Sequence, residues 1–233
     1  MLSTEELKNY VYNEVQTRLG EVSCGNLYFA EGIDNSVEGI YIFNKKEQKK
    51  ELRNLIVAYA KKLGYKARQN TIFRVKDAAM VYCDFLVVDS KKLIYRVNIK
   101  NYDYDDIFWK IMQMPSNSKE PDSLRAVGAF QAPTITVKTG QMELTDQYEE
   151  QAKVLVELVE ESSNRFMEQY DIDEYAINCQ GEMYINVLKY LAYVHMNKKS
   201  EARRIAEEAL RDGDVNNFEN EGKTFFEWAL MQQ

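Results

Sequence analysis

The chain has 233 residues, of which 45% are hydrophobic and 29% are charged, and a formal net charge of −7. This balance is typical of a folded globular protein and excludes general disorder. No stretch approaches the roughly 18 to 20 uncharged apolar residues of a membrane span, and the N-terminus lacks the basic and apolar regions of a signal peptide, so we expect a cytoplasmic protein without a membrane partner.

The N-terminal part of the chain predicts a helix followed by a β-hairpin. Ser3 and Glu6 have the spacing of a capping box, apolar residues then recur at helical spacing, and Gly20 ends the helix. Two short aromatic or β-branched runs, residues 26–30 and 38–43, are separated by a turn-favouring GIDNS segment. We expect these two runs to pair as antiparallel strands.

The middle of the chain predicts a second helix and a three-stranded sheet. Residues 45–63 place Leu52, Ile56 and Tyr59 on one helical face, before a stop at Gly64. Three strands are expected next, near residues 71–75, 79–88 and 93–100. The second strand is apolar on both faces, which suits a central position. The third alternates, with a polar face made by Arg96, Asn98 and Lys100.

Beyond the sheet the chain predicts a short helix and an irregular region. The helix covers about residues 105–114, and the acidic residues at its start, Asp103, Asp105 and Asp106, would favour the positive end of its dipole. The proline-bearing region that follows predicts loop with one or two strands, at 124–130 and 134–138.

From about Gly140 the pattern is helical. An amphipathic helix runs from Tyr148 to Phe166, and residues 183–196 and 200–211 predict a helical hairpin that turns at Asn197. Thr224 and Glu227 cap a final helix. The chain is therefore expected to be α+β, with a mainly antiparallel sheet and flanking helices in a domain 1–140 and an all-helical part at 141–233.

Charge is unevenly distributed along the chain. Residues 45–76 carry eleven Lys and Arg against two Glu, whereas the chain from Gly140 onward carries nine basic and twenty acidic residues. The basic candidates for a binding surface on the second helix are Lys45, Lys46, Lys49, Lys50, Arg53, Lys61 and Lys62. They fit a solvated face, a face docked on the chain's own acidic helices, or contact with an acidic partner. Nucleic acid is less favoured because the net charge is negative.

The sequence contains few of the residues that form the common catalytic and metal sites. Its three cysteines are far apart and unpaired in sequence, and its single histidine, His195, lies on an apolar helical stretch, where a core or surface role is the ordinary one. There is no glycine-rich phosphate loop and no Gly-x-Ser-x-Gly motif. The sequence thus predicts no cofactor.

Residues 45–130, with the order helix, three-strand meander, helix and strand, resemble the core of restriction-endonuclease-like nucleases. That family places an Asp on the second strand and an Asp/Glu-x-Lys motif on the third, where the carboxylates hold Mg²⁺ and the lysine acts on the attacking water. Asp84 matches the first position and Lys100 matches the lysine. Asn98 replaces the family's acid, and Glu51 would supply only an accessory one. In a purely structural interpretation, Asp84 pairs with Lys100 or Arg96 across the strands.

Residues 183–211 resemble a single tetratricopeptide-type hairpin. Tyr193, Glu201, Ala202 and Ala209 match its pattern, and Asn197 stands where the turn usually has Gly. A concave binding surface of that class needs several repeats, so a generic helical hairpin is the alternative.

These observations favour a non-catalytic intracellular binding protein that presents an acidic helical part and an aromatic-rich sheet to another protein. A bacterial immunity or accessory protein would have such a composition. The alternative is a Mg²⁺-dependent or degenerate nuclease that uses Asp84, Asn98, Lys100 and Glu51. The sequence indicates no particular oligomeric state.

Overall fold

The computed structural model describes residues 35–88, 91–182, 184–214 and 218–232, with side chains described from residue 49 onward. The chain forms two compact units, Met1–Leu52 and Arg53–Gln233. The predicted helix after Ser3 and the predicted strand at 26–30 lie outside the described residues.

The first described element is the helix α2, Asn35–Lys62, which runs from the first unit into the second. The predicted helix at 45–63 is confirmed, whereas the predicted strand at 38–43 is wrong because these residues belong to α2. Each residue added to an existing helix gains one hydrogen bond, and the Lys, Glu and Gln run that follows has high helix propensity. This cooperativity outweighs the β preference of the short aromatic run at 38–43, which explains why these residues are helical.

The second unit is built on a five-stranded antiparallel sheet in the order β1 to β5. The strands are β1 Lys66–Arg68, β2 Thr71–Lys76, β3 Ala79–Val88, β4 Lys92–Asn101 and β5 Ile135–Glu143. The three strands predicted near residues 71–75, 79–88 and 93–100 are confirmed, and β5 is longer than predicted. The register between β4 and β5 shifts between Val97 and Asn98, which leaves Val137 as an extra, bulged residue.

The helices that follow β4 differ in part from the prediction. They are α3 Asp103–Ile111, the 3₁₀ helix η2 Pro115–Lys119 and α4 Ser123–Val127. The predicted strand at 124–130 is wrong, because its first half forms α4. Arg125 reaches into the core from this helical turn and pairs there with Asp106, a tertiary contact that local propensity does not reveal.

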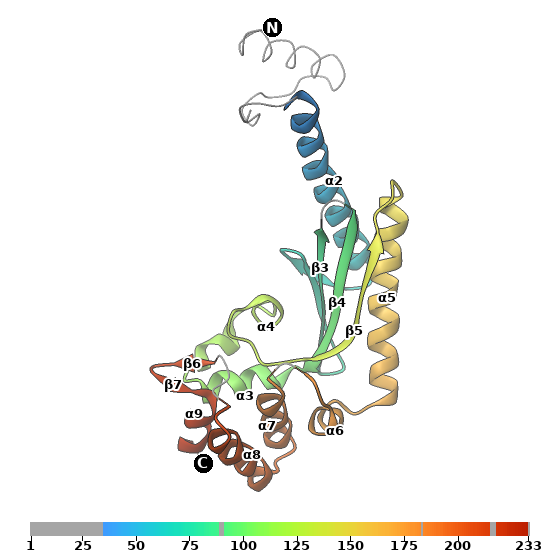
Figure 1. Ribbon diagram of the computed structural model, residues 1–233. Helices are drawn as coiled ribbons and strands as arrows, with labels where there is room; N and C mark the ends of the chain where they lie inside the picture. Colours follow the sequence, from blue (N-terminus) through green and yellow to red (C-terminus); the bar gives the residue numbers. More distant parts are fainter. Residues whose placement is uncertain (1–34, 89–90, 183, 215–217, 233) are drawn as a thin grey trace. The chain divides into compact units, whose positions relative to one another are not determined.

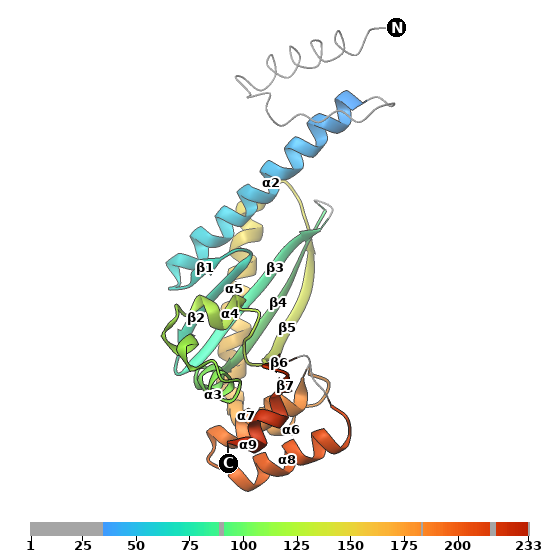
Figure 2. The ribbon, with the colours of Figure 1, turned by 90° about the vertical axis from the view of Figure 1, so that its left-hand side faces the viewer.

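The two faces of the sheet are covered by different helices, as Figures 1 and 2 show. The helix α5, Tyr148–Gln169, lies on one face, where Arg74 of β2 pairs with Glu160 at 2.7 Å and Lys76 donates to Asn164. On the other face, α4 packs on a buried cluster made by Phe73, Met80, Tyr82 and Ala126. Figure 2 shows α4 in front of only one part of the sheet.

The described C-terminal part is helical apart from a short hairpin of two strands with two residues each. It contains α6 Ile172–Asn178, α7 Ile185–His195, α8 Lys199–Arg211, the strands β6 Glu219–Asn220 and β7 Lys223–Thr224, and α9 Phe225–Met231. The predicted hairpin of α7 and α8 is confirmed, with Asn197 at φ 60° in its turn, and so is the Thr224–Glu227 capping box.

The chain therefore has the predicted α+β fold, with a helical C-terminal part. The boundary placed at residue 140 lies within β5, and the division into domains 1–140 and 141–233 stays a prediction. Among the described helices, none is both long enough and apolar enough to span a membrane.

Candidate functional site

One face of the sheet changes character along its length. The pairs of β3 and β4 residues on this face are, in order, Met80 and Lys100, Tyr82 and Asn98, Asp84 and Arg96, and Leu86 and Ile94. The first two pairs are buried, Asp84 is half-buried, and the remaining three residues are exposed. We call the Lys100 side the closed end of this face and the Ile94 side its open end.

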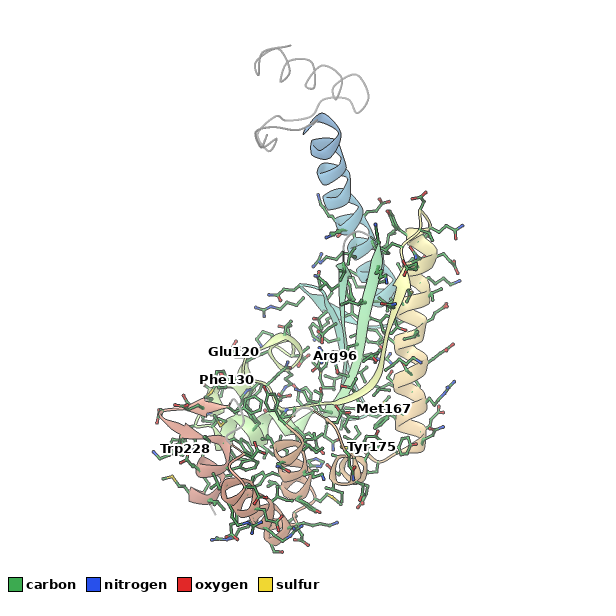
Figure 3. The ribbon with its side chains drawn as sticks, viewed as in Figure 1. Arg96, Glu120, Phe130, Met167, Tyr175 and Trp228 are labelled. Atoms are coloured by element: carbon green, nitrogen blue, oxygen red, sulfur yellow. The ribbon has the colours of Figure 1, made fainter. Side chains whose placement is uncertain are left out.

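A cleft of about 380 Å³ lies over the middle of this face. Its floor is formed by Tyr82, Asp84, Arg96 and Asn98 of the sheet, and residues 128–133, the wall segment, form one side. Glu182, Tyr184 and Phe218 line it from the C-terminal part. Figure 3 labels Arg96 on the sheet and Phe130 on the wall segment. We call this space the sheet-face cleft.

A second, shallower space continues from the cleft toward the open end. This apolar groove has a volume of about 610 Å³ and shares Asp84 and Arg96 with the sheet-face cleft. Leu86 and Ile94, 50% and 38% exposed, line it. Large apolar side chains exposed side by side next to a polar cleft are typical of a binding surface.

Asp84 lies where the cleft and the groove meet. Its carboxylate accepts hydrogen bonds from Thr71 Oγ1 at 2.7 Å and from Asn98 Nδ2 at 3.3 Å, and Arg96 is its partner on β4. Burial raises the pKa of Asp84, while the hydrogen bond from Thr71, the charge of Arg96 and the hydrogen bond from Asn98 oppose the rise. The carboxylate of Asp84 therefore lies in a half-buried position where the neighbouring groups stabilise its negative charge only in part.

The wall segment is fixed to the sheet by a buried ion pair. Lys100 Nζ lies 2.9 Å from Asp105 Oδ2 and also donates to the carbonyl oxygen of Ala132. Asp105 in turn accepts from the Ala132 N–H, and Trp109 Nε1 donates to the carbonyl oxygen of Phe130. Both charged side chains are completely buried. Burial lowers the pKa of Lys100 and raises that of Asp105, and their attraction opposes both shifts.

Arg125 completes this buried polar cluster. Its guanidinium pairs with Asp106 at 2.7 Å, lies 4.0 Å from Asp105, and stacks over the Tyr102 and Trp109 rings. Sequence reasoning missed Arg125 and assigned Asp105 only to the helix dipole. An acid follows Lys100 by five residues, but the sequence does not distinguish it from its neighbours Asp103 and Asp106.

Two further acceptors line the sheet-face cleft. Gln131 Oε1 is buried and has no hydrogen-bond partner among the described residues. Glu182 Oε1 accepts from the backbone N–H of Thr136, which leaves its other oxygen for a further partner. Two carboxylates and the Gln131 amide oxygen thus place acceptors at three points of the cleft.

The structure brings together only some of the residues of the nuclease-like motif. Asp84 and Asn98 are in contact, but Lys100 is committed to Asp105 inside the closed end. Asn98 directs its amide N–H to Asp84, so its nitrogen and not its oxygen faces the carboxylate. Glu51 is exposed on α2 and belongs to the first unit. No group of three or more His, Cys, Asp or Glu that fits a metal ion occurs among the described residues.

The predicted basic surface stays a prediction. The side chains of Lys45 and Lys46 lie outside the described residues, and Lys49, Lys50, Lys61 and Lys62 are exposed. Within the second unit, Arg53 donates to the carbonyl oxygen of Gln69, and Lys62 lies over the Tyr59 ring.

Further along the basic segment, several side chains contact other parts of the same unit. Lys66 pairs with Asp122 at 2.8 Å, Arg68 donates to Ser123, and Arg74 pairs with Glu160. The ion pairs of Lys66 and Arg74 support the interpretation that part of the positive charge of this segment pairs with the chain's own acidic groups.

His195 has a structural environment. Its Nδ1 lies 2.7 Å from Asp173 Oδ2, and Tyr104 donates to the other oxygen of Asp173 at 2.7 Å. These contacts join α7, α6 and α3.

Whether the α7–α8 hairpin is of the tetratricopeptide type stays a prediction. Comparison of the chain with protein-family models, with curated proteins and with solved structures gave no match.

Proposed function

We propose that this chain is a non-catalytic binding protein and that the sheet-face cleft and the apolar groove together receive an extended segment of another protein. The observation that carries the proposal is the exposed pair of Leu86 and Ile94 on the same sheet face as the structured polar cleft. Burying an exposed leucine or isoleucine side chain contributes about 1.5 to 3 kcal/mol, so this pair gives a partner an apolar anchor beside a polar one.

The shape of the site supports a peptide segment over a compact small molecule. The two spaces follow one line of cross-strand pairs, from Asn98 through Arg96 to Ile94, and share residues at their junction. A segment in extended conformation presents side chains at regular intervals along such a line. One of its side chains enters the cleft while a neighbour covers the groove.

The nuclease alternative is less well supported by this geometry. A lysine that orients or deprotonates water needs access to the reacting centre, whereas Lys100 is fully buried and held by Asp105 and Ala132. An asparagine beside Asp84 adds no charge for a divalent ion. Cleavage of DNA or RNA with Mg²⁺ or Mn²⁺ that is lost in Asp84→Asn would overturn the non-catalytic proposal.

The proposal is tested by selecting short random peptides on the immobilised full-length chain and measuring their dissociation constants in solution. We expect Leu86→Asp and Ile94→Asp each to weaken the selected peptides by about tenfold or more, because a charge then occupies the apolar anchor position. Val154→Asp on α5 is the matched control, since Val154 is 40% exposed and lies outside both spaces.

Two outcomes would contradict this function. The first is a selection that yields no peptide with saturable binding. The second is an equal loss of affinity in Val154→Asp and Ile94→Asp, which would show that binding does not depend on this face of the sheet. Circular dichroism and thermal unfolding of each variant establish that the fold is retained.

A further inference from the structure

We infer that the sheet-face cleft recognises a basic side chain, the guanidinium of Arg or the ammonium of Lys, in the segment that the groove binds. This inference rests on the proposed function and specifies the chemistry of the ligand at one position. It is carried by the charges, the acceptors and the aromatic rings that line the cleft.

The charged residues of the cleft favour a cation. Asp84 and Glu182 are acidic, and Arg96 is the one basic residue among the described lining residues. Arg96 forms no ion pair within 4.0 Å of Asp84 in the described part of the chain, and Asp84 takes its hydrogen bonds from the neutral Thr71 and Asn98. A cationic ligand would therefore give Asp84 its first direct countercharge.

The unpaired acceptors favour a ligand with several N–H donors. The buried Gln131 Oε1 has no partner among the described residues, and a buried acceptor without a donor is destabilising until a ligand supplies one. Glu182 and Asp84 add carboxylate oxygens at other points of the same cleft. Guanidinium and ammonium groups carry only donors, so they complement this lining better than a carboxylate, a phosphate or an apolar side chain.

Aromatic rings form another part of the lining. Phe130 of the wall segment, Tyr184 and Phe218 border the cleft, and the Tyr184 and Phe218 ring centroids lie 4.7 Å apart. The face of such a ring attracts a cation and packs against the aliphatic stem of a basic side chain. Tyr184 also has φ 57°, a left-handed conformation that is uncommon for a residue with a side chain and tends to occur at functional sites.

The first experiment uses the peptides selected for the proposed function. We expect each to contain Arg or Lys at one required position, and replacement of that Arg by the isosteric, neutral citrulline to weaken binding by about tenfold or more. In Glu182→Gln and in Asp84→Asn the same replacement should have a smaller effect than in the wild type, because each variant lacks one of the two carboxylates, and in the variant that combines both substitutions the effect should fall below about threefold. Glu157→Gln on α5 removes one charge outside the cleft and should retain the full effect.

Peptides that bind equally well with citrulline, or whose citrulline effect is unchanged in both cleft variants, would overturn the inference. The proposed function would stand in that case if Ile94→Asp still abolished binding. Selection of peptides that require an acidic residue would also overturn it.

A second experiment does not depend on any selected peptide. N-acetyl-arginine amide, titrated into the full-length chain, should shift the backbone amide signals of residues 130–132, 182 and 184 in NMR spectra. N-acetyl-citrulline amide, or the arginine compound added to Glu182→Gln, should not produce these shifts. Shifts that are absent, or that are the same with citrulline, would refute recognition of a basic side chain at this cleft.

Discussion

Both ends of one sheet face contain a basic and an acidic side chain, but the pair is buried and in direct contact at the closed end and at least partly exposed at the open end. At the closed end, Lys100 has a charged partner in Asp105 and a carbonyl acceptor in Ala132 although no water reaches it. At the open end, Arg96 is exposed, Asp84 accepts hydrogen bonds only from neutral donors, and Leu86 and Ile94 are 50% and 38% exposed.

This contrast separates structural from functional polarity. Buried charged groups of the closed end have charged partners inside the chain, as Lys100 has Asp105 and Arg125 has Asp106, because an unpaired buried charge is strongly destabilising. Polar groups that await a ligand are short of partners within the chain, as Gln131 Oε1 is. The two ends should therefore respond differently to substitution, with stability affected at the closed end and binding at the open end.

The largest effect on stability is expected at the closed end. Asp105→Ala removes the countercharge of a fully buried lysine and should lower the free energy of unfolding by about 3 to 5 kcal/mol, as measured by urea denaturation. Asp103→Ala, two residues earlier in the same helix, changes an exposed carboxylate and should cost less than about 1 kcal/mol. Equal losses in the two variants would contradict the division into two ends.

A smaller effect is expected where the wall segment begins. A Cβ atom at Gly128 would collide with the backbone carbonyl oxygen of Leu124, so Gly128→Ala should destabilise the protein by about 1 to 3 kcal/mol. At Gly140, in β5, a Cβ would instead meet the hydroxyl end of Tyr95, a side chain that can rotate away. Gly140→Ala should therefore cost less than about 1 kcal/mol in the same denaturation experiment. The reverse order would show that the wall segment is not rigidly placed.

A still smaller, pH-dependent effect is expected at Asp84. Its pKa is higher in the folded than in the unfolded chain, so the folded protein binds more protons between the two values and loses stability as the pH rises through that interval. Asp84→Asn removes this loss. The variant should melt at a higher temperature than the wild type at neutral pH, and the difference should vanish below about pH 3, where both states are protonated. Lower stability of Asp84→Asn at neutral pH would assign Asp84 to the structural class.

The smallest effect is expected for the apolar anchor itself. Leu86→Thr and Ile94→Thr keep residues that suit a strand, and because both positions are exposed each should change the free energy of unfolding by less than about 0.5 kcal/mol. Val97→Thr, on the opposite, buried face, should cost about 1 to 3 kcal/mol because a hydroxyl replaces a methyl group in the core. Thermal unfolding distinguishes the two cases, and a large loss in Ile94→Thr would show that this residue is covered within the chain.

Much of the sheet is predictable from the sequence because local patterns coincide with the tertiary environment. The alternation of β4 and the two-sided apolar character of β3 place their residues correctly, and with them the contact between Asp84 and Asn98. Short elements such as β1 and α6 give too little periodicity to be detected. The composition of residues 124–130 favours a strand, although the first half of this run forms a helix whose buried Arg125 pairs with the partly exposed Asp106.

The closed end shows why the site was only half predictable. The sequence places Lys100 on the polar face with Asn98 and Arg96, which the register confirms. Its partner Asp105 and the covering segment at Ala132 come from later in the chain, and nothing in the strand pattern indicates that they seal it. Burial of a strand residue depends on which segment returns to cover it, and that is a tertiary property.

The bulge at Val137 decides which charges reach the open end. A regular β5 continued from the pair of Asn98 and Thr136 would place Lys138 opposite Arg96. Asp84, Arg96 and Lys138 would then lie in a row across β3, β4 and β5, and the second cation would repel a basic ligand. With the extra residue, Thr139 takes that place, and Lys138 turns to the α5 side, where it lines a pocket with Arg165. The same strand composition without this irregularity would thus give the open end one more cation and a weaker preference for a basic ligand.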